Sequence, residues 1–255
     1  MLSAEQVIEL QRQGWIQADY HLTELFDGTV NRNFCLTSGQ KRFFLKLFSQ
    51  SGGDRQDRLR QFDLQQRIAA HGMAPEPLYV SERHDFMLEA WLEIQDLASA
   101  RLSKPQKIQR LAERLFAIHQ LPIDCADLPL VDDWQHYIQR GAIQDRTLLA
   151  QVEELSPRWL ALPKPVFCHH DLCLAHVCLM PKRVCLDWEY AAMSTPVYDI
   201  ASSILAEGLD AQQGRWLSDS YAKISSTCAT ALWQEVQQMR PFAELTNRLW
   251  HLAHR

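Results

Sequence analysis

The spacing of hydrophobic residues differs between the first third of the chain and the remainder. In the first third, segment 33–48 (NFCLTSGQKRFFLKLF) contains two short apolar runs on either side of the polar residues 38–41. Segment 77–92 (PLYVSERHDFMLEAWL) repeats this arrangement around residues 81–84. Short strand-like runs joined by turn-forming residues are typical of β-hairpins. We therefore expect two hairpins in the first third of the chain.

Helical spacing is found at the N-terminus, between the two hairpins and through most of the remaining chain. Ser3 with Gln6, and Ser103 with Gln106, match the capping box that begins many helices. Apolar residues follow both pairs at a spacing of three to four. Further helical regions are expected at about 59–71, at about 131–155 and from 196 to the end.

Residues 166–191 (VFCHHDLCLAHVCLMPKRVCLDWEYA) interrupt the helical second part. They predict the end of a strand, a polar loop, and two short strands around residues 181–183. The chain is therefore expected to be an α+β protein, with a sheet-rich first lobe and a mostly helical second lobe. The boundary is placed near residues 90–95, and the cleft between two such lobes is a usual place for a ligand.

The composition restricts the possible classes of function. A chain of 255 residues is long enough for one large domain or two lobes. Hydrophobic residues make up 47% and charged residues 22%, which is typical of a globular protein and not of a disordered one. The formal net charge of −5 gives no basic excess for nucleic acid or an anionic membrane. No apolar run approaches the roughly 18 residues of a membrane span.

The cysteines and the N-terminus indicate a cytoplasmic protein. The chain has seven cysteines, an odd number, and no C-x-x-C pair, so neither a disulfide framework nor a cysteine zinc site is expected. The first residues, MLSAEQVIELQRQG, lack the basic start and apolar core of a secretory signal. Free thiols are typical of a reducing compartment.

The densest group of ionisable residues lies within 169–189, among apolar strand-like residues. It comprises His169, His170, Asp171, His176, Asp187 and Glu189. Burying such groups is costly unless they are paired or bind a metal. Because a hairpin can return the chain to its start, Asp171 and Asp187 could face one cavity. One carboxylate could then orient a hydroxyl while the other holds Mg²⁺, a division of roles that phosphoryl transfer requires.

The segments HHDLCLAHVCL (169–179) and CLDWEYA (185–191) resemble the aminoglycoside phosphotransferase, choline kinase and thiamine kinase family. The family pattern is H-x-D-x-x-x-x-N, a hairpin, and then an aspartate that opens the metal loop. The form DWEYA looks most like the choline and thiamine kinase branches. Other segments resemble the family in the same order over about residues 15–225, including GTVNRNF for the nucleotide loop and FFLKLF for a phosphate-binding lysine.

The resemblance implies a two-lobed, protein-kinase-like fold. Residues 1–92 would form a nucleotide-binding lobe with a small antiparallel β-sheet. Residues 93–255 would form a mostly helical lobe that carries the catalytic and substrate-binding groups. The implied reaction is transfer of the γ-phosphate of ATP to an alcohol, with Mg²⁺ as the metal, and the choice of ATP over GTP stays open.

The resemblance also implies roles for individual residues. Asp171 would accept or orient the substrate hydroxyl, and His169 would brace the catalytic loop. Asp187 would bind the Mg²⁺ that bridges the nucleotide phosphates. Lys46 would contact the α- and β-phosphates, and Asp63, on the first-lobe helix, is our candidate for the acidic residue that steadies it. Further nucleotide-binding candidates are Gly28, Asn31 and Glu89.

His176 stands where the family has an asparagine that serves as a second metal ligand. Mg²⁺ prefers oxygen ligands, whereas imidazole suits transition metals better. The histidine could therefore leave the second metal position weak, shift the preference towards Mn²⁺, or mark a catalytically impaired, binding-only relative. We expect an active kinase and keep the binding module as the alternative.

Aromatic residues and a carboxylate point to a cationic acceptor. Trp188, Glu189 and Trp91 are the candidates for substrate contact, and Trp134 offers a further aromatic face, since aromatic faces beside an acid attract organic cations. Thiamine and choline are the leading examples, and an aminoglycoside is less favoured because the chain has no long acidic loop. The identity of the acceptor and the oligomeric state stay open, and neither nucleic acid nor membrane is an expected partner.

Two other enzyme classes share parts of the motif. His169-x-Asp171 fits the start of a 2-His-1-carboxylate iron site, but such sites need a distant histidine on a β-barrel, and this chain is mostly helical after residue 190. His170-Asp171 also spells the pair of helical metal phosphohydrolases. Here the pair follows a strand-like segment and precedes a hairpin, which disfavours that class.

Overall fold

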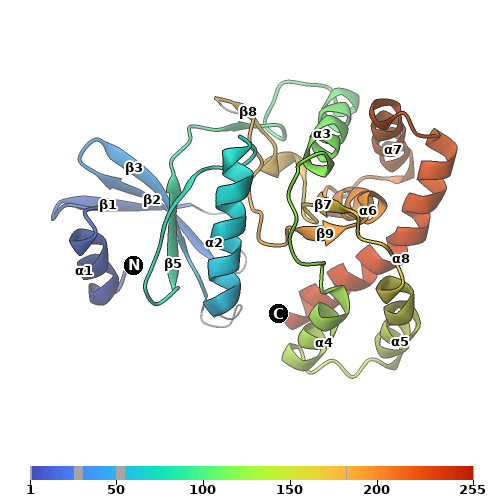
Figure 1. The fold of residues 1–255 in the computed structure, drawn as a ribbon, viewed down its shortest axis with the longest axis horizontal. Helices are drawn as coiled ribbons and strands as arrows, with labels where there is room; N and C mark the ends of the chain where they lie inside the picture. The colour runs from blue at the N-terminus through green and yellow to red at the C-terminus, as the bar shows by residue number, and fades with distance from the viewer. Residues whose placement is uncertain (1, 26–30, 50–54, 182, 255) are drawn as a thin grey trace. The chain divides into compact units, whose positions relative to one another are not determined.

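The computed structural model describes residues 2–25, 31–49, 55–181 and 183–254, without the side chains of 55–57 (Figure 1). The chain forms two compact units, Met1–Ile94 and Gln95–Arg255. The first holds an antiparallel sheet and the second is mostly helical, which confirms the expected fold class. The nucleotide-binding and catalytic roles expected for residues 1–92 and 93–255 remain predictions.

In the described part of the first unit, five strands form one antiparallel sheet in the order β1-β2-β3-β5-β4. The strands are β1 (Tyr20–Leu25), β2 (Arg32–Ser38), β3 (Lys41–Leu47), β4 (Pro77–Val80) and β5 (Phe86–Ala90), and the helices are α1 (Ala4–Arg12) and α2 (Arg55–Ala70). Both expected hairpins, β2-β3 and β4-β5, are therefore confirmed. Strand β1 was not predicted.

The β2-β3 hairpin is tight because Ser38 pairs directly with Lys41, which leaves two residues for the turn. The first of them, Gly39, has a φ of 59°, a left-handed conformation that glycine adopts without a steric penalty. Side chains alternate between buried and more exposed along both strands. The buried ones join a core made of Leu10, Ile16, Phe34, Leu36, Phe43, Leu45, Phe86 and Leu88.

In the second unit, the described residues form helices around two short pairs of strands. Its helices are α3 (Lys104–His119), α4 (Leu130–Arg140), α5 (Arg146–Leu160), α6 (Pro196–Ala206), α7 (Ala211–Ser225) and α8 (Ala229–Ala253), with the 3₁₀ turn η1 (Leu174–His176). Its strands are β6 (Gln95–Asp96), β7 (Val166–Cys168), β8 (Cys178–Met180) and β9 (Ala192–Ser194). Helix α3 packs against α7, and α6 packs against α8 (Figure 1). Within the described ranges, no helix is both long and apolar enough to cross a bilayer.

The helical region expected at 131–155 is two helices rather than one. Helix α4 ends before Gly141, and Ala142 has a left-handed φ of 45°. Helix α5 then begins after Asp145, whose side chain accepts hydrogen bonds from the N–H groups of Thr147 and Leu148. Apolar residues continue at helical spacing through residues 141–145, so only the capping residues indicate that one helix ends and another begins there.

The expectation of two strands around residues 181–183 is half wrong. Strand β8 precedes this turn, but its partner is β6, far earlier in the chain. Residues 183–191 form no strand, and an isolated bridge joins Cys185 to Val177. A second short sheet, β7 with β9, was not predicted. Together these pairings fix both ends of segment 169–191.

Candidate active site

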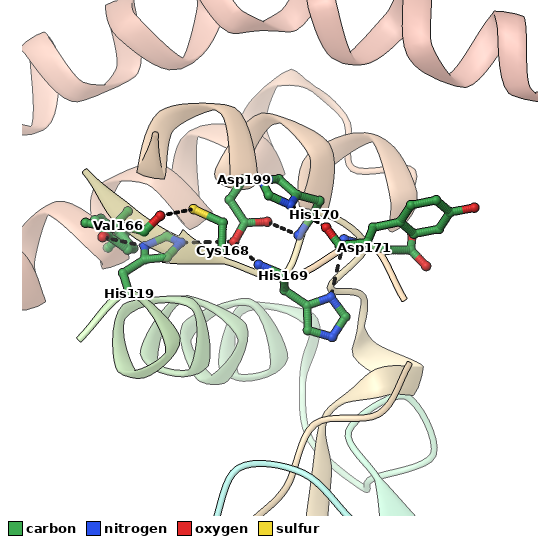
Figure 2. A network of polar contacts seen from close by, with 9 residues as sticks. His119, Val166, Cys168, His169, His170, Asp171 and Asp199 are labelled. Atoms are coloured by element: carbon green, nitrogen blue, oxygen red, sulfur yellow. Dashed lines mark hydrogen bonds and ion pairs between the residues drawn. The ribbon is translucent and has the colours of Figure 1, made fainter. Parts of the chain in front are cut away.

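The loop from His169 to His176 connects β7 to β8, and Asp199 of helix α6 holds its first residues. The fully buried Asp199 carboxylate accepts hydrogen bonds from the backbone N–H groups of His169 (2.9 Å) and His170 (2.7 Å). Figure 2 shows Asp199 between this backbone and the imidazole of His119. A buried carboxylate that accepts several hydrogen bonds holds its partners firmly in place. If any of these hydrogen bonds is lost, part of the negative charge is left unpaired in the core, which is costly.

The charge of Asp199 is stabilised on its other side by helix α3. The Nε2 atom of His119 lies 3.0 Å from Asp199 Oδ2, and its Nδ1 atom lies 2.8 Å from the Tyr221 hydroxyl of α7. Burial alone would raise the pKa of Asp199. The hydrogen bond from His119, the proximity of His170 and the backbone donor at His169 outweigh that effect and hold the pKa well below its usual range.

Glu207, immediately after α6, holds the far end of the same loop. Its Oε2 atom accepts a hydrogen bond from the N–H of Leu174 (3.0 Å), and its Oε1 atom pairs with Lys104 (2.9 Å). The loop is thus attached to α6 at its first residues and to the C-terminal cap of that helix at η1. This explains how a segment without regular structure can present side chains in fixed positions.

The chain returns to this loop at Leu186. Its N–H donates to the carbonyl of His176, and its carbonyl accepts from Nε2 of His169, both at 2.9 Å. Since a carbonyl can only accept, the proton of the His169 ring is on Nε2, and Nδ1 is free to accept from the N–H of Asp171 (3.3 Å). Burial lowers the pKa of His169 to about 4, so the ring is neutral.

This return brings together the two carboxylates that the sequence placed sixteen positions apart. Asp171, His176 and Asp187 each offer a ligand atom, and these atoms lie within 4.8 Å of one another. All three side chains are half-buried. His170 and Asp187 both have left-handed backbones, with φ values of 69° and 60°. Such conformations are strained for residues other than glycine and are often found at functional sites.

The pKa values of this cluster reflect its crowding. Burial raises the pKa of Asp171 to about 6, the His176 ring lowers it, and the nearby Asp187 and Glu189 charges add to the increase. Burial would lower the pKa of His176, but Cys173, Asp171 and Asp187 together raise it to about 9. The Nδ1 atom of His176 lies 2.7 Å from the backbone carbonyl of Asp171.

The donor set of this cluster fits a divalent cation. Two carboxylates supply the oxygen ligands that Mg²⁺ and Mn²⁺ prefer, and they repel each other unless a positive charge lies between them. The imidazole of His176 adds a nitrogen donor, which transition metals accept more readily than Mg²⁺ does. The sequence-predicted metal residues are therefore brought together, and their function as ligands remains a prediction.

Trp188, expected to contact substrate, is buried behind the loop. Its indole N–H donates to the carbonyl of Cys185 (2.8 Å), its ring stacks on Phe167 at 5.9 Å, and His169 lies 4.5 Å away. Glu189 is half-buried and its charge contributes to the raised pKa of Asp171. Trp134 is likewise a core residue, hydrogen-bonded to Thr246.

Two tyrosines near Glu189, and a tryptophan that contacts one of them, were not predicted from the sequence. Burial raises the pKa values of Tyr137 and Tyr190, and the Glu189 charge adds to both shifts. The indole of Trp250 donates to the Tyr190 hydroxyl (3.0 Å), and His254 stacks on that indole at 4.4 Å. Tyr190 could have been found from its place in DWEYA. Tyr137 and Trp250, on α4 and α8, gave no signal apart from helical periodicity.

The remaining candidates lie in the first unit. Lys46 is half-buried on β3, opposite Asn33 and Met87. Glu89 is buried on β5 and Asp63 is exposed on α2. Asn31 accepts a hydrogen bond from the N–H of Ser49 (3.3 Å), Trp91 lies under the Arg42 guanidinium at 5.6 Å, and Gly28 lies outside the described residues. The roles of these residues remain predictions.

Replacing Asp199 with alanine should strongly destabilise the second unit, because two backbone N–H groups and His119 lose their buried acceptor. We expect the free energy of unfolding, measured with urea at neutral pH, to fall by about 3 kcal/mol. Asp219→Asn is the matched control, since it breaks a partly exposed ion pair with Arg215 and should cost less than about 1 kcal/mol. Equal losses in the two variants would contradict the anchoring role.

The lowered pKa of Asp199 also makes stability depend on pH with a definite sign. The folded-state value lies below the unfolded value of about 4, so the stabilisation is fully present above about pH 4 and is lost as the pH falls through the folded-state value. Between about pH 5 and pH 2, the wild-type protein should therefore lose more unfolding free energy than Asp199→Ala. Parallel curves for the two proteins would show that this carboxylate is not the group responsible.

Comparison with known proteins shows the family and the fold of this chain. The Phosphotransferase enzyme family matches residues 21–238 of the chain. Choline kinase LicA from Streptococcus pneumoniae is similar in structure, with a TM-score of 0.72 and 16% identity, over 97% of this chain and 89% of that one. Aminoglycoside-3'-phosphotransferase of type VIII has a TM-score of 0.70 and 15% identity, over 96% of this chain and 100% of that one.

A choline kinase from Cryptosporidium parvum Iowa II has a TM-score of 0.70 and 15% identity, over 98% of this chain and 89% of that one. No curated protein sequence matches. The structural matches are below 25% identity and establish the kinase-like fold alone, whereas the family match covers most of the chain. The chain therefore belongs to the Phosphotransferase enzyme family.

Proposed function

We propose that this protein is an ATP-dependent kinase that transfers the γ-phosphate to the hydroxyl of a small, cationic alcohol such as thiamine or choline. Membership of the family supports phosphotransfer to a small molecule. The observation that carries the proposal is the convergence of Asp171 and Asp187, with ligand atoms within 4.8 Å, on a loop anchored by a buried carboxylate. In that arrangement, Asp171 could orient the acceptor hydroxyl while Asp187 binds a metal ion.

Asp171 is the proposed catalytic residue. Its half-buried carboxylate would accept a hydrogen bond from the acceptor hydroxyl, point the oxygen at the γ-phosphorus and take the proton as the new bond forms. Its pKa of about 6 leaves it ionised at neutral pH and more basic than an ordinary aspartate. His169 does not touch the reacting atoms in this proposal, because both of its ring nitrogens hold the loop.

Asp187 would hold the divalent ion together with His176. The ion would neutralise charge on the nucleotide phosphates as the terminal group is transferred. Lys46 would contact the α- and β-phosphates, with Asp63 steadying its ammonium group. A LicA structure in complex with AMP, 16% identical over 99% of this chain, supports nucleotide use by the family.

Glu189 and Tyr190 are the proposed acceptor-binding residues. Glu189 places a negative charge near Asp171, and Tyr190 provides an aromatic ring next to it in the chain. A carboxylate beside aromatic rings favours an organic cation. Of the aromatic residues expected from sequence, Trp188 is covered by Phe167 and His169, and Trp91 by Arg42. They are therefore weaker candidates for the cation than Tyr190.

The second candidate function is a non-catalytic nucleotide-binding module. His176, in the position of the asparagine of the family pattern, is the observation that favours it. An enzyme would release ADP only in the presence of an acceptor and a divalent ion, whereas a module would bind the nucleotide without turnover. This difference decides between the two functions.

Asp171→Asn should reduce kcat by at least about 100-fold, because asparagine cannot take the hydroxyl proton. The nucleotide KM should change little. The assay follows transfer of labelled phosphate from ATP to thiamine, choline, ethanolamine and an aminoglycoside, with Mg²⁺ or Mn²⁺. Asp219→Asn, far from the loop in sequence and partly exposed, should retain full activity. Wild-type turnover by Asp171→Asn would exclude the proposed mechanism, and no turnover by the wild type with any acceptor would favour the module.

Glu189→Gln should affect cationic acceptors selectively, because it removes a charge and preserves the shape of the side chain. We expect KM for the best cationic acceptor to rise about tenfold, equivalent to about 1.4 kcal/mol. KM for ATP should stay the same. An uncharged alcohol of similar size serves as the control acceptor, and its KM should not rise. If both acceptors lose affinity equally, the carboxylate does not recognise the positive charge.

A further inference from the structure

The backbone at His176 is fixed by contacts that do not involve its side chain. Its N–H donates to the carbonyl of Cys173 (3.1 Å), and its carbonyl accepts from the N–H of Leu186 (2.9 Å). Residue 176 therefore lies opposite the residue that precedes Asp187. The backbone at this position is therefore fixed by hydrogen bonds, and it lies beside Asp187, the proposed metal ligand.

The imidazole of His176 is oriented by the loop itself. Its Nδ1 atom lies 2.7 Å from the backbone carbonyl of Asp171, and because that carbonyl can only accept, Nδ1 is the nitrogen that carries a proton. Nδ1 also lies 3.8 Å from Asp171 Oδ2, so Nε2 is the ring nitrogen that these contacts with Asp171 leave for a metal. Metal-binding histidines characteristically donate their other ring N–H to a carbonyl or carboxylate in this way, which fixes the tautomer and the ring direction.

The carboxylates around His176 complete the donor set. Asp171, His176 and Asp187 form a half-buried group whose oxygen and nitrogen ligand atoms lie within 4.8 Å of one another. The nearby His169 ring lies 6.1 Å away and cannot substitute, since one of its nitrogens donates to the Leu186 carbonyl and the other accepts from the Asp171 N–H. His176 is thus the imidazole in this group that is positioned to act as a ligand.

We infer that Nε2 of His176 is a direct ligand of the divalent cation, so that this protein selects Mn²⁺ and later first-row metals over Mg²⁺. Mg²⁺ demands oxygen ligands and keeps its waters, whereas affinity for nitrogen donors rises along the transition series. The inference rests on the proposed function for the location of the metal, but metal binding can be measured without any phosphotransfer. The competing interpretation is an imidazolium that pairs with the carboxylates and never meets the metal.

Electron spin-echo envelope modulation of Mn²⁺ bound to the full chain, without nucleotide, tests the contact directly. A bound imidazole gives a ¹⁴N modulation of the Mn²⁺ signal. We expect this modulation in the wild type and its replacement by a ¹⁵N modulation when the histidines are labelled with ¹⁵N. Both His176→Asn and His176→Gln should lose it, and His136→Asn, an exposed histidine on α4, should keep it.

The selectivity is measured by competition between Mn²⁺ and Mg²⁺, with free Mn²⁺ followed by its electron paramagnetic resonance. His176→Asn restores the oxygen donor of the family pattern, and we expect the preference for Mn²⁺ over Mg²⁺ to fall by about tenfold. The His136→Asn preference should equal that of the wild type. Thermal unfolding of each variant shows whether it is folded, and the ¹⁵N-labelled wild type gives an answer that needs no variant.

Absence of nitrogen modulation in Mn²⁺-bound wild type would overturn the inference, and so would an unchanged metal preference in folded His176→Asn. Nitrogen modulation that vanishes in both His176 variants would support it even if no acceptor is ever phosphorylated. Conversely, active kinase without nitrogen modulation would uphold the proposed function and reject the histidine ligand. The two proposals can therefore fail separately.

Discussion

A single buried negative charge organises the candidate site. Asp199 carries its charge in the core, where it survives because His119 and two backbone N–H groups donate to it. Those two N–H groups belong to the residues that immediately precede Asp171. The same helix, α6, leads to Glu207, which holds the other end of the loop. The position of the proposed catalytic carboxylate is thus set by hydrogen bonds to buried charges inside the second unit. Helix α6 places those charges, but the loop that carries Asp171 has little regular secondary structure of its own.

Local signals in the sequence were sufficient for much of the fold. Turn residues between alternating runs predicted the β2-β3 and β4-β5 hairpins, and capping residues predicted the starts of α1 and α3. Pairings between distant segments were missed or misassigned. Strand β6 has only two residues and β9 only three, so neither has a period that could be read, and their partners lie far away in the chain.

In the candidate site too, features close together in the sequence could be predicted, whereas contacts between distant segments could not. Asp171 and Asp187 could be predicted to meet, because a loop and a returning segment are short-range features. The aromatic residues around Glu189 and Tyr190 could not, since Tyr137 and Trp250 lie more than a hundred positions apart, on two different helices, and look like ordinary core residues. Trp188 is a different case: its place beside Asp187 suggests substrate contact, whereas its ring packs against Phe167 and His169, and its role stays a prediction.

The left-handed backbones at His170 and Asp187 place a limit on how stable this protein can become. Glycine would adopt both conformations without strain, so a substitution there could relieve some of the steric penalty in the folded state. It would also remove the imidazole that reaches the Tyr190 carbonyl, or the carboxylate that faces Asp171. Stabilisation of these two positions and retention of their side-chain chemistry are therefore opposed, and selection for heat resistance would have to act elsewhere in the chain.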